Sequence, residues 1–269
     1  MTNLKRLFRI LRYAGRSFSI QAILFIPVLL FFACGGGGAG SGGERWIVTT
    51  LAGDGTRGYL DDTGTAAQFN WPNDVTVDSL GNVYVADGWN YRIRKIDPDG
   101  VVTTVAGDGT KGYADGTGTG AQFSDPRGIA IDSSGNIYVT DDDSYTSSCR
   151  IRKITSAGVV TTLAGGGYGY ADGTGTGAQF NQQPSGIAVD SDGNVYVSHE
   201  LNYIPRIRKI DITGYVTTIA GGYGQGYSDG PGGSAKFYGL FGMAADGDGN
   251  IYVADRGNNR IRKITLVSD

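Results

Sequence analysis

The chain of 269 residues has very little cysteine, histidine or glutamate, which narrows the chemistry open to it. It has two cysteines and one histidine, His199, and its only glutamates are Glu44 and Glu200. Two cysteines cannot build a disulfide framework. Metal-assisted and acid–base catalysis most often use His, Cys or Glu side chains, so the sequence indicates neither catalytic residues nor a metal site.

Positive charge is also scarce once the N-terminal segment is set aside. Residues 1–33 carry five of the 23 Lys and Arg and no acid, which leaves 18 cations against 26 acids and a net charge of about −8. Proteins that bind nucleic acids use clustered cationic side chains to contact phosphates. We therefore expect no nucleic-acid partner.

The N-terminal segment has the composition of an export signal. Its five cations come first, and residues 22–33 are then apolar without interruption until Cys34. This apolar run is shorter than the ~20 residues of a membrane-spanning helix, although an uncleaved N-terminal anchor is an alternative. The motif Leu30-Phe31-Phe32-Ala33-Cys34 resembles a bacterial lipoprotein signal, which implies that Cys34 becomes the lipidated first residue of the mature chain.

This resemblance implies an order of segments and a location. We expect a signal segment at residues 1–33 and a Gly-rich tether at residues 34–45 that starts at lipidated Cys34. Such a tether is flexible and lets a folded domain stand clear of a bilayer. The chain is then predicted to be attached to a membrane through its lipid, in the cell envelope, facing the periplasm or the outer surface.

The remaining residues, 46–269, contain a fourfold repeat. The segment Ile47-Val48-Thr49-Thr50-Leu51-Ala52-Gly53 recurs in similar form from residues 101, 159 and 215, at spacings of 54, 58 and 56 residues. Units of this length are single supersecondary units that bury their apolar surface by stacking on their neighbours. Residues 46–269 are therefore predicted to form one four-repeat domain.

Each repeat is predicted to be an antiparallel meander of four short strands. In the second unit the β-type runs are residues 128–132, 136–141, 150–154 and 159–163. Turn-forming residues, Ser133-Ser134-Gly135 and Ser156-Ala157-Gly158, join the first two runs and the last two. The first two runs are apolar on both faces and the last two are more polar, which is typical of a β-propeller blade with its first strand on a central axis.

The two ends of the domain are complementary. The domain begins with a lone fourth-type strand, residues 47–52, and the chain ends after a third-type strand, residues 260–264. We therefore expect an all-β fold, a β-propeller of four four-stranded blades in which the N-terminal strand closes the last blade, because an open arrangement would leave unpaired edges. A monomer is expected, and exchange of these strands between two chains is the alternative.

The units resemble NHL repeats. Asn82-Val83-Tyr84-Val85-Ala86-Asp87, followed by Asn90 and Arg92-Ile93-Arg94-Lys95-Ile96, matches the pattern of that family, and residues 250–261 match it again. The resemblance covers residues 47–266 and implies a propeller, commonly of six blades, so four repeats depart from the family in number. It implies much less about function.

Binding residues are predicted on the face that carries the long connections between blades. The link from Gly107 to Pro126 takes about twenty residues, and loops of that length are usually functional or disordered. The residues before each innermost strand and in the second connection differ between units, either because they bind one specific partner or because these loops have drifted. The predicted binding residues are Asn73, Asp74, Trp89, Tyr91, Arg127, Ser185, His199, Glu200 and Phe241.

Aspartate ends the second strand and arginine begins the third in three of the units. These residues are predicted to form structural ion pairs or hydrogen bonds that bridge the connecting loop. The third unit has His199 in place of the aspartate, and an isolated imidazole could act as a base or as a ligand. The predicted pairs are Asp87 with Arg92, Asp141 with Arg150, and Asp255 with Arg260.

The repeated long links and the aspartate-rich turns are predicted to be structural. In the links a Tyr and a Phe, such as Tyr113 and Phe123, are expected to hold the loop against the blade. The turns, such as Asp190-Ser191-Asp192-Gly193-Asn194, resemble the start of a calcium loop but lack the glutamate of its twelfth position. No cofactor is therefore expected, and calcium on clustered aspartates is the alternative.

Three functions are consistent with these features. The first is a non-catalytic module that binds a protein or a glycan. The second is an enzyme, because some propellers related to the family resemble lactonases or lyases, although Val, Ile and Ala occupy the axial strands where metal ligands would be needed. The third is a structural component of a larger assembly.

Overall fold

The computed structural model describes most of the repeat domain. The described residues are 46–143, 148–180, 184, 186–201, 203–222 and 224–267. The predictions made for residues 1–45, including Cys34, and for Ser185 lie outside them. The chain divides into two compact units at Ile47, and the fold described below is that of the second unit, Val48–Asp269.

The unit is all-β and contains four antiparallel sheets, one for each repeat, which we call blades 1 to 4. Blade 1 contains β1 (Pro72–Val77), β2 (Val83–Asp87), β3 (Arg92–Ile96) and β4 (Val102–Ala106). Blade 2 contains β5 (Gly116–Thr117), β6 (Pro126–Ile131), β7 (Ile137–Asp143), β8 (Ser148–Ile154) and β9 (Val159–Gly165). Blade 3 contains β10 (Gly173–Thr174), β11 (Gly186–Val189), β12 (Val195–Leu201), β13 (Ile204–Ile210) and β14 (Tyr215–Gly221). Blade 4 contains β15 (Leu240–Ala245), β16 (Ile251–Asp255) and β17 (Arg260–Ile264).

Six short 3-10 helices lie in the connections. They are η1 (Gly64–Ala66), η2 (Gly88–Asn90), η3 (Gly118–Gly120), η4 (Gly175–Gly177), η5 (Gly232–Ser234) and η6 (Arg256–Asn258). Helices η3, η4 and η5 belong to the long links and pack on the outer strands β4, β9 and β14 of the preceding blade. None of the described helices is long and apolar enough to cross a bilayer.

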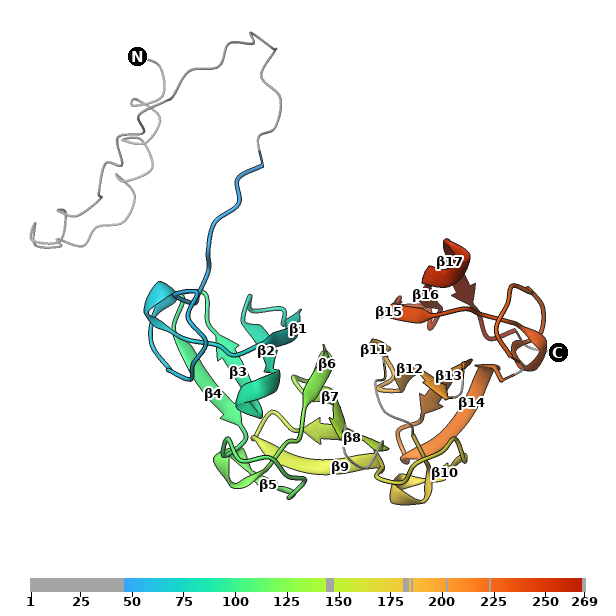
Figure 1. The fold of residues 1–269 in the computed structure, drawn as a ribbon, viewed down its shortest axis with the longest axis horizontal. Coiled ribbons are helices and arrows are strands. Elements are labelled where there is room, and N and C mark those ends of the chain that lie inside the picture. The colour runs from blue at the N-terminus through green and yellow to red at the C-terminus, as the bar shows by residue number, and fades with distance from the viewer. Residues whose placement is uncertain are drawn as a thin grey trace, which may run out of the picture. The chain divides into compact units, whose positions relative to one another are not determined.

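The blades follow one another with their first strands innermost (Figure 1). Strand β1 packs on β6, β6 on β11, and β11 on β15. Apolar clusters fill the spaces between consecutive blades, such as the cluster of Ile93, Phe123 and Ile129 between blades 1 and 2. The core thus lies between sheets, which is the propeller-like arrangement predicted from the repeats.

The blades differ in their number of strands, and the prediction of four strands in each is only partly correct. Blades 2 and 3 gain a fifth strand because β5 and β10, from the link ahead of each blade, pair with its outer strand. In blade 1 the corresponding contact is a single bridge between Thr63 and Val101. Blade 4 has three strands and ends at β17.

The predicted closure of blade 4 by the N-terminal strand is not found. Residues 46–52 form no strand in the structure, and the last sheet is β15, β16 and β17 alone. Strand β15 packs on β11 and is not among the strands packed on β1. The physical reason is that blade 4 packs on blade 3 and not on blade 1, so the edge of β17 is out of reach of the segment that precedes blade 1.

Candidate functional site

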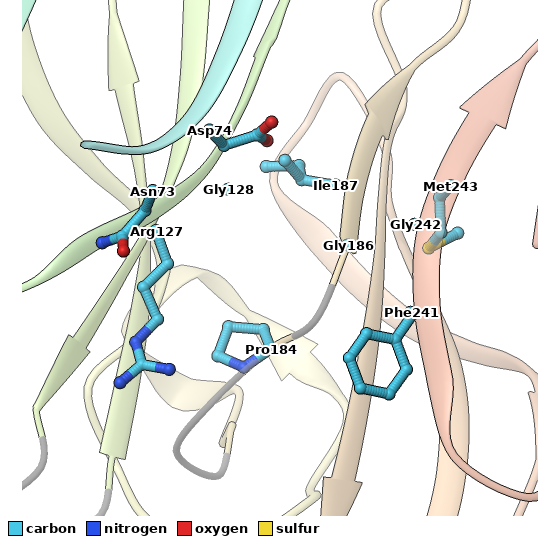
Figure 2. Close-up of a pocket in the computed structure, with 10 residues that line it drawn as sticks. All are labelled: Asn73, Asp74, Arg127, Gly128, Pro184, Gly186, Ile187, Phe241, Gly242 and Met243. Carbon is cyan, nitrogen blue, oxygen red and sulfur yellow. The ribbon is translucent and has the colours of Figure 1, made fainter. Parts of the chain in front are cut away.

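A pocket lies where the innermost strands begin, on the face that carries the long links. Its volume is about 470 Å³, and its walls come from the beginnings of β1, β6, β11 and β15 (Figure 2). The lining residues are Asn73, Asp74, Arg127, Gly128, Pro184, Gly186, Ile187, Phe241, Gly242 and Met243. The structure therefore brings together four of the nine predicted binding residues, Asn73, Asp74, Arg127 and Phe241.

Two of these four side chains also join blade 1 to blade 2. The Asn73 side-chain amide donates to the Pro126 carbonyl at 2.9 Å. The Asp74 carboxylate accepts a hydrogen bond from the Ile129 amide at 3.0 Å. Because these contacts fix both rotamers, Asn73 and Asp74 give the pocket a preorganised polar wall.

Arg127 supplies positive charge on the same side of the pocket. Its Nε lies 3.0 Å from an Asp125 carboxylate oxygen and 3.3 Å from one of Asp142, while about a third of its side chain is exposed. Two carboxylates on one edge of the guanidinium hold the group in place beside the pocket.

The opposite wall is apolar. Phe241 and Met243 lie on β15, and Figure 2 shows the Phe241 ring across the pocket from Arg127. The Phe241 ring is partly exposed, and the Arg256 guanidinium lies 4.8 Å from its centroid. The pocket thus offers an anionic group, a cationic group and an apolar surface within one cavity, a combination suited to binding.

Beside Asn73, two tryptophans form an exposed stacked pair. The centroids of Trp71 and Trp89 are 5.4 Å apart, and the side chains are 50% and 57% exposed. The Arg57 guanidinium lies 5.0 Å from the Trp71 centroid. Trp71 also has φ 52°, a left-handed conformation that is uncommon for a bulky residue and often marks a functional site.

Trp89 is among the binding residues predicted from the sequence, and Trp71 is not. The signal was present, because Asn70-Trp71-Pro72 aligns with Ser124-Asp125-Pro126 of the next unit, so the tryptophan stands at a position that differs between blades. Gly88 places Trp71 close to the pocket residue Asn73. The Gly88 amide donates a hydrogen bond to the Trp71 carbonyl, and Gly88 lies so near the Asn73 side-chain amide that a Cβ on Gly88 would clash with it.

Three other predicted binding residues lie away from the pocket. Tyr91 is half-buried and follows η2 with φ 54°. Glu200, on β12, accepts a hydrogen bond from Gln225 at 3.3 Å, in the link ahead of blade 4. His199, predicted as a binding residue of the rim, is buried in the structure.

His199 fills the position that aspartate has in the other blades. Its Nε2 lies 3.3 Å from Nη1 of Arg208, which is also buried. Burial, with a smaller contribution from the charge of Arg208, lowers the pKa of His199 to about 3. The imidazole is therefore neutral at pH 7 and acts as a hydrogen-bond acceptor for Arg208.

The predicted aspartate–arginine pairs involve a different arginine. Asp87 pairs with Arg94 at 2.9 Å in place of Arg92, and Asp141 pairs with Arg152 at 3.0 Å in place of Arg150. In blade 4 the partner of Asp255 is likewise Arg262. The reason is that each predicted arginine stacks on a tyrosine of the long link: Arg92 on Tyr59, Arg150 on Tyr113 and Arg260 on Tyr227.

The buried arginine of each blade also holds the long link in place. Arg152 donates to the Asp115 carboxylate at 2.9 Å and to the carbonyls of Ala114 and Gln122, and its guanidinium lies 5.1 Å from the Phe123 ring. Burial, opposed by Arg152, raises the pKa of Asp141 to about 6. The links are thus held by their Tyr and Phe, as predicted, and by a buried ion pair that the sequence analysis did not assign.

The aspartate-rich turns use their carboxylates internally. Asp246 accepts hydrogen bonds from the amides of Asp248 and Asn250 and from the Asn250 side chain, and these bonds, the side-chain one most, lower the pKa of Asp246. Asp190 accepts the equivalent bonds in blade 3. Among the described residues there is no group of three or more His, Cys, Asp or Glu side chains placed to hold a metal ion.

The blades match a known repeat family. The NHL repeat model matches residues 69–96, 123–154 and 238–264, which lie in blades 1, 2 and 4. These are NHL repeats. The matched segments do not include blade 3, in which His199 replaces the aspartate.

Relatives of this NHL-repeat propeller are much longer proteins. The chain is 32% identical over 235 residues to protein SUPPRESSOR OF QUENCHING 1, chloroplastic, of Arabidopsis thaliana, which covers 81% of the chain and 22% of that protein. It is 28% identical over 220 residues to teneurin-3 of Mus musculus, covering 72% of the chain and 8% of that protein. The chain spans less than a quarter of the length of these relatives.

A solved structure supports the fold of the NHL-repeat domain. A putative phosphatase from Bacteroides thetaiotaomicron has a TM-score of 0.54 at 20% identity, over 74% of this chain and 49% of that one. At this identity the likeness concerns the fold alone.

Proposed function

We propose that this NHL-repeat propeller is a non-catalytic binding module that takes a protein or glycan ligand on its long-link face. The observation that carries the proposal is the exposed Trp71–Trp89 pair beside the pocket of Asn73, Arg127 and Phe241. Contiguous exposed apolar surface, such as two stacked tryptophans, often marks a site that binds a partner. Trp and Arg are also the residue types that contribute most to protein interfaces, which favours a protein over a glycan.

Two other functions are kept as alternatives. A lactonase- or lyase-like enzyme would need a metal or an acid–base pair, and no observation in the described residues favours one over binding. A purely structural role in an assembly would use the blades and leave the Trp71–Trp89 pair without a function. Substitutions in this pair therefore separate binding from scaffolding.

The binding proposal predicts the effect of truncating one tryptophan. Trp89→Ala is expected to weaken ligand binding at least tenfold, about 1.4 kcal/mol, because the side chain is exposed and stacks on Trp71. The measurement is capture of envelope proteins and of an immobilised glycan panel by the full chain, followed by titration of the ligand found. A glycan as the captured ligand would identify the second ligand class.

A matched control lies on the opposite face of the propeller. Leu80 is 77% exposed in the turn between β1 and β2, so Leu80→Ala removes a comparable apolar group far from the Trp pair. This variant should bind as the parent does. Equal binding by the Trp89 and Leu80 variants would refute the assignment of the ligand site to this face.

We also propose that the domain is held in the cell envelope by a lipid on Cys34, in the periplasm or at the outer surface. The support is the order of cations, apolar run and cysteine in residues 1–34. Cys34→Ser is expected to leave the precursor unprocessed or to release the domain from the membrane fraction. The measurement is fractionation with immunoblotting, with Cys149→Ser as the control because Cys149 is buried in blade 2. Normal processing and membrane attachment of the Cys34 variant would contradict the proposal.

A further inference from the structure

In blades 1, 2 and 3 the same contacts hold the outer strand, β4, β9 or β14, in the sheet. An aspartate of the long link accepts hydrogen bonds from the second threonine of that strand. In blade 1 the Thr104 amide lies 3.0 Å from the Asp61 carboxylate, and in blade 3 the Thr218 amide lies 2.9 Å from that of Asp172. In blade 2 the Thr162 hydroxyl makes the equivalent contact, at 3.0 Å from Asp115. An outer strand of sequence Val-Thr-Thr thus fits a slot between the third strand and the link.

In blade 4 this slot is open. A cavity of about 750 Å³ lies between β17 and the link residues 229–232, with Phe237 in its wall. Asp229, the equivalent of Asp61, has a side chain that is 70% exposed. Ile261 on β17 is 75% exposed, whereas the equivalent isoleucines Ile93, Ile151 and Ile207 are fully buried.

The N-terminal segment has the sequence that fits this slot but is unpaired. Residues 47–53 repeat the outer-strand sequence, and Thr50 aligns with Thr104. Val48 is 99% exposed and Leu51 is half exposed. An unpaired strand of apolar and threonine residues readily adds to an open sheet edge.

The end of this segment is held against blade 1 in the same way as an internal outer strand. The Gly53 amide donates to the Gly64 carbonyl, as Gly107 does to Gly118 in the next unit. The Leu51 carbonyl lies 3.9 Å from the position of a Cβ on Gly64, which matches the 3.8 Å between the Val105 carbonyl and Gly118. The segment therefore stands where the outer strand of a preceding blade would stand.

The face of blade 1 beside this segment is also uncovered. Val75 on β1 is 57% exposed, whereas its equivalents Ile129 and Ile187 are about 5% exposed beneath the neighbouring blade. Phe69 is partly exposed, although Phe123 is fully buried. Blade 1 therefore presents the surface that normally receives a preceding blade, and blade 4 presents the surface that normally receives a following one.

We propose that the partner of each end is a second copy of this chain. Blade 4 of one copy docks on blade 1 of the other, and residues 47–52 of that other copy become the fourth strand of β15, β16 and β17. Thr50 then hydrogen-bonds to Asp229, as Thr104 does to Asp61. The contact is heterologous, and two of them related by a twofold axis close a ring of eight blades.

A second copy is favoured over the chain's own segment because the two ends are separate within one molecule. Strand β15 does not pack on β1, yet both surfaces are exposed and complementary. This dimer replaces the monomer expected from the sequence. It is argued from residues 47–52, Phe69, Val75 and the edge of β17, and not from the Trp71–Trp89 pair on which the proposed ligand site rests.

Cysteine cross-linking tests this pairing directly. In blade 1 Lys95 faces Thr103 across β3 and β4, so Lys263 on β17 would face Thr49 of the second copy. Full-length chains carrying Thr49→Cys and Lys263→Cys singly are co-expressed and oxidised in membranes. We expect a covalent dimer on a non-reducing gel, at least tenfold above the parent chain, which still carries Cys34 and Cys149. Both substituted positions are exposed, so folding should be unaffected.

The controls separate exchange from closure within one chain. Thr49→Cys co-expressed with Lys95→Cys should give no covalent dimer, because β4 already occupies the edge of β3. The double variant, with Thr49→Cys and Lys263→Cys in one chain, should also give covalent dimer. An intramolecularly cross-linked monomer from the double variant, or no dimer above the parent from the mixed single variants, would overturn the proposal.

Discussion

Arg152→Met should destabilise the NHL-repeat domain by about 3–5 kcal/mol, because it leaves the buried Asp141 carboxylate without its partner. The change also removes the donors to the Gln122 and Ala114 carbonyls, which hold the long link on blade 2. In a domain of this size each kcal/mol lowers the Tm by about 2–4 °C, so a fall of about 10 °C is expected. Urea unfolding and a thermal scan at pH 7 measure both quantities.

Lys153→Met is the matched control for this change. Lys153 neighbours Arg152 on β8 but is only half-buried, and its Nζ lies 5.6 Å from the Tyr138 ring. Its loss should cost under about 1 kcal/mol. If the two variants were equally stable, the buried ion pair would not be what holds the link. The difference in unfolding free energy between the parent chain and the Arg152 variant should also become smaller as the pH is lowered from 7 to 5, because the unpaired, buried Asp141 carboxyl becomes protonated.

His199 should make the domain less stable in mild acid. Its pKa is about 3 in the folded state against about 6.5 when unfolded, so between these pH values only the unfolded chain takes up the proton. The stabilisation is complete above pH 6.5 and is lost as the pH falls toward 3, by about 1.4 kcal/mol per unit. From pH 7 to pH 5 the expected loss is about 2 kcal/mol.

His199→Gln isolates this effect. The glutamine amide oxygen can accept the hydrogen bond from Arg208 but does not titrate. The parent chain should lose about 2 kcal/mol more than the variant between pH 7 and pH 5, as measured by urea unfolding at both values. If the unfolding free energies of the parent chain and the His199→Gln variant changed equally with pH, His199 would take up its proton in the folded state as easily as in water.

Much of the fold could be predicted because the repeat presents the same pattern four times. The strands of blade 2, the tight turns and the Tyr and Phe of the links follow from local composition and from copies that agree. Which arginine pairs with Asp87, Arg92 or Arg94, could not be predicted. Residues two apart on a strand point to the same face, so both side chains can reach Asp87. Stacking of Arg92 on Tyr59, across the link, decides that choice.

The candidate site was predicted less completely for a related reason. Asn73, Arg127 and Phe241, which line the pocket, were predicted as binding residues because the residues before the innermost strands differ between copies. Trp71 also stands at a position that differs between copies, but its left-handed backbone and its contact with Trp89 do not follow from the sequence. His199 was predicted at the rim because the second connection differs between copies, and its buried contact with Arg208 does not follow from the sequence.

The self-contained charge pairing of each unit bears on how such chains change length in evolution. Arg152 joins Asp141 of its blade to Asp115 of the link that precedes that blade, so both partners lie within one repeat of 54–58 residues. Unequal recombination that adds or deletes a whole repeat would therefore carry every buried charge with its partner. Such a change in blade number would need no compensating substitution at these ion pairs.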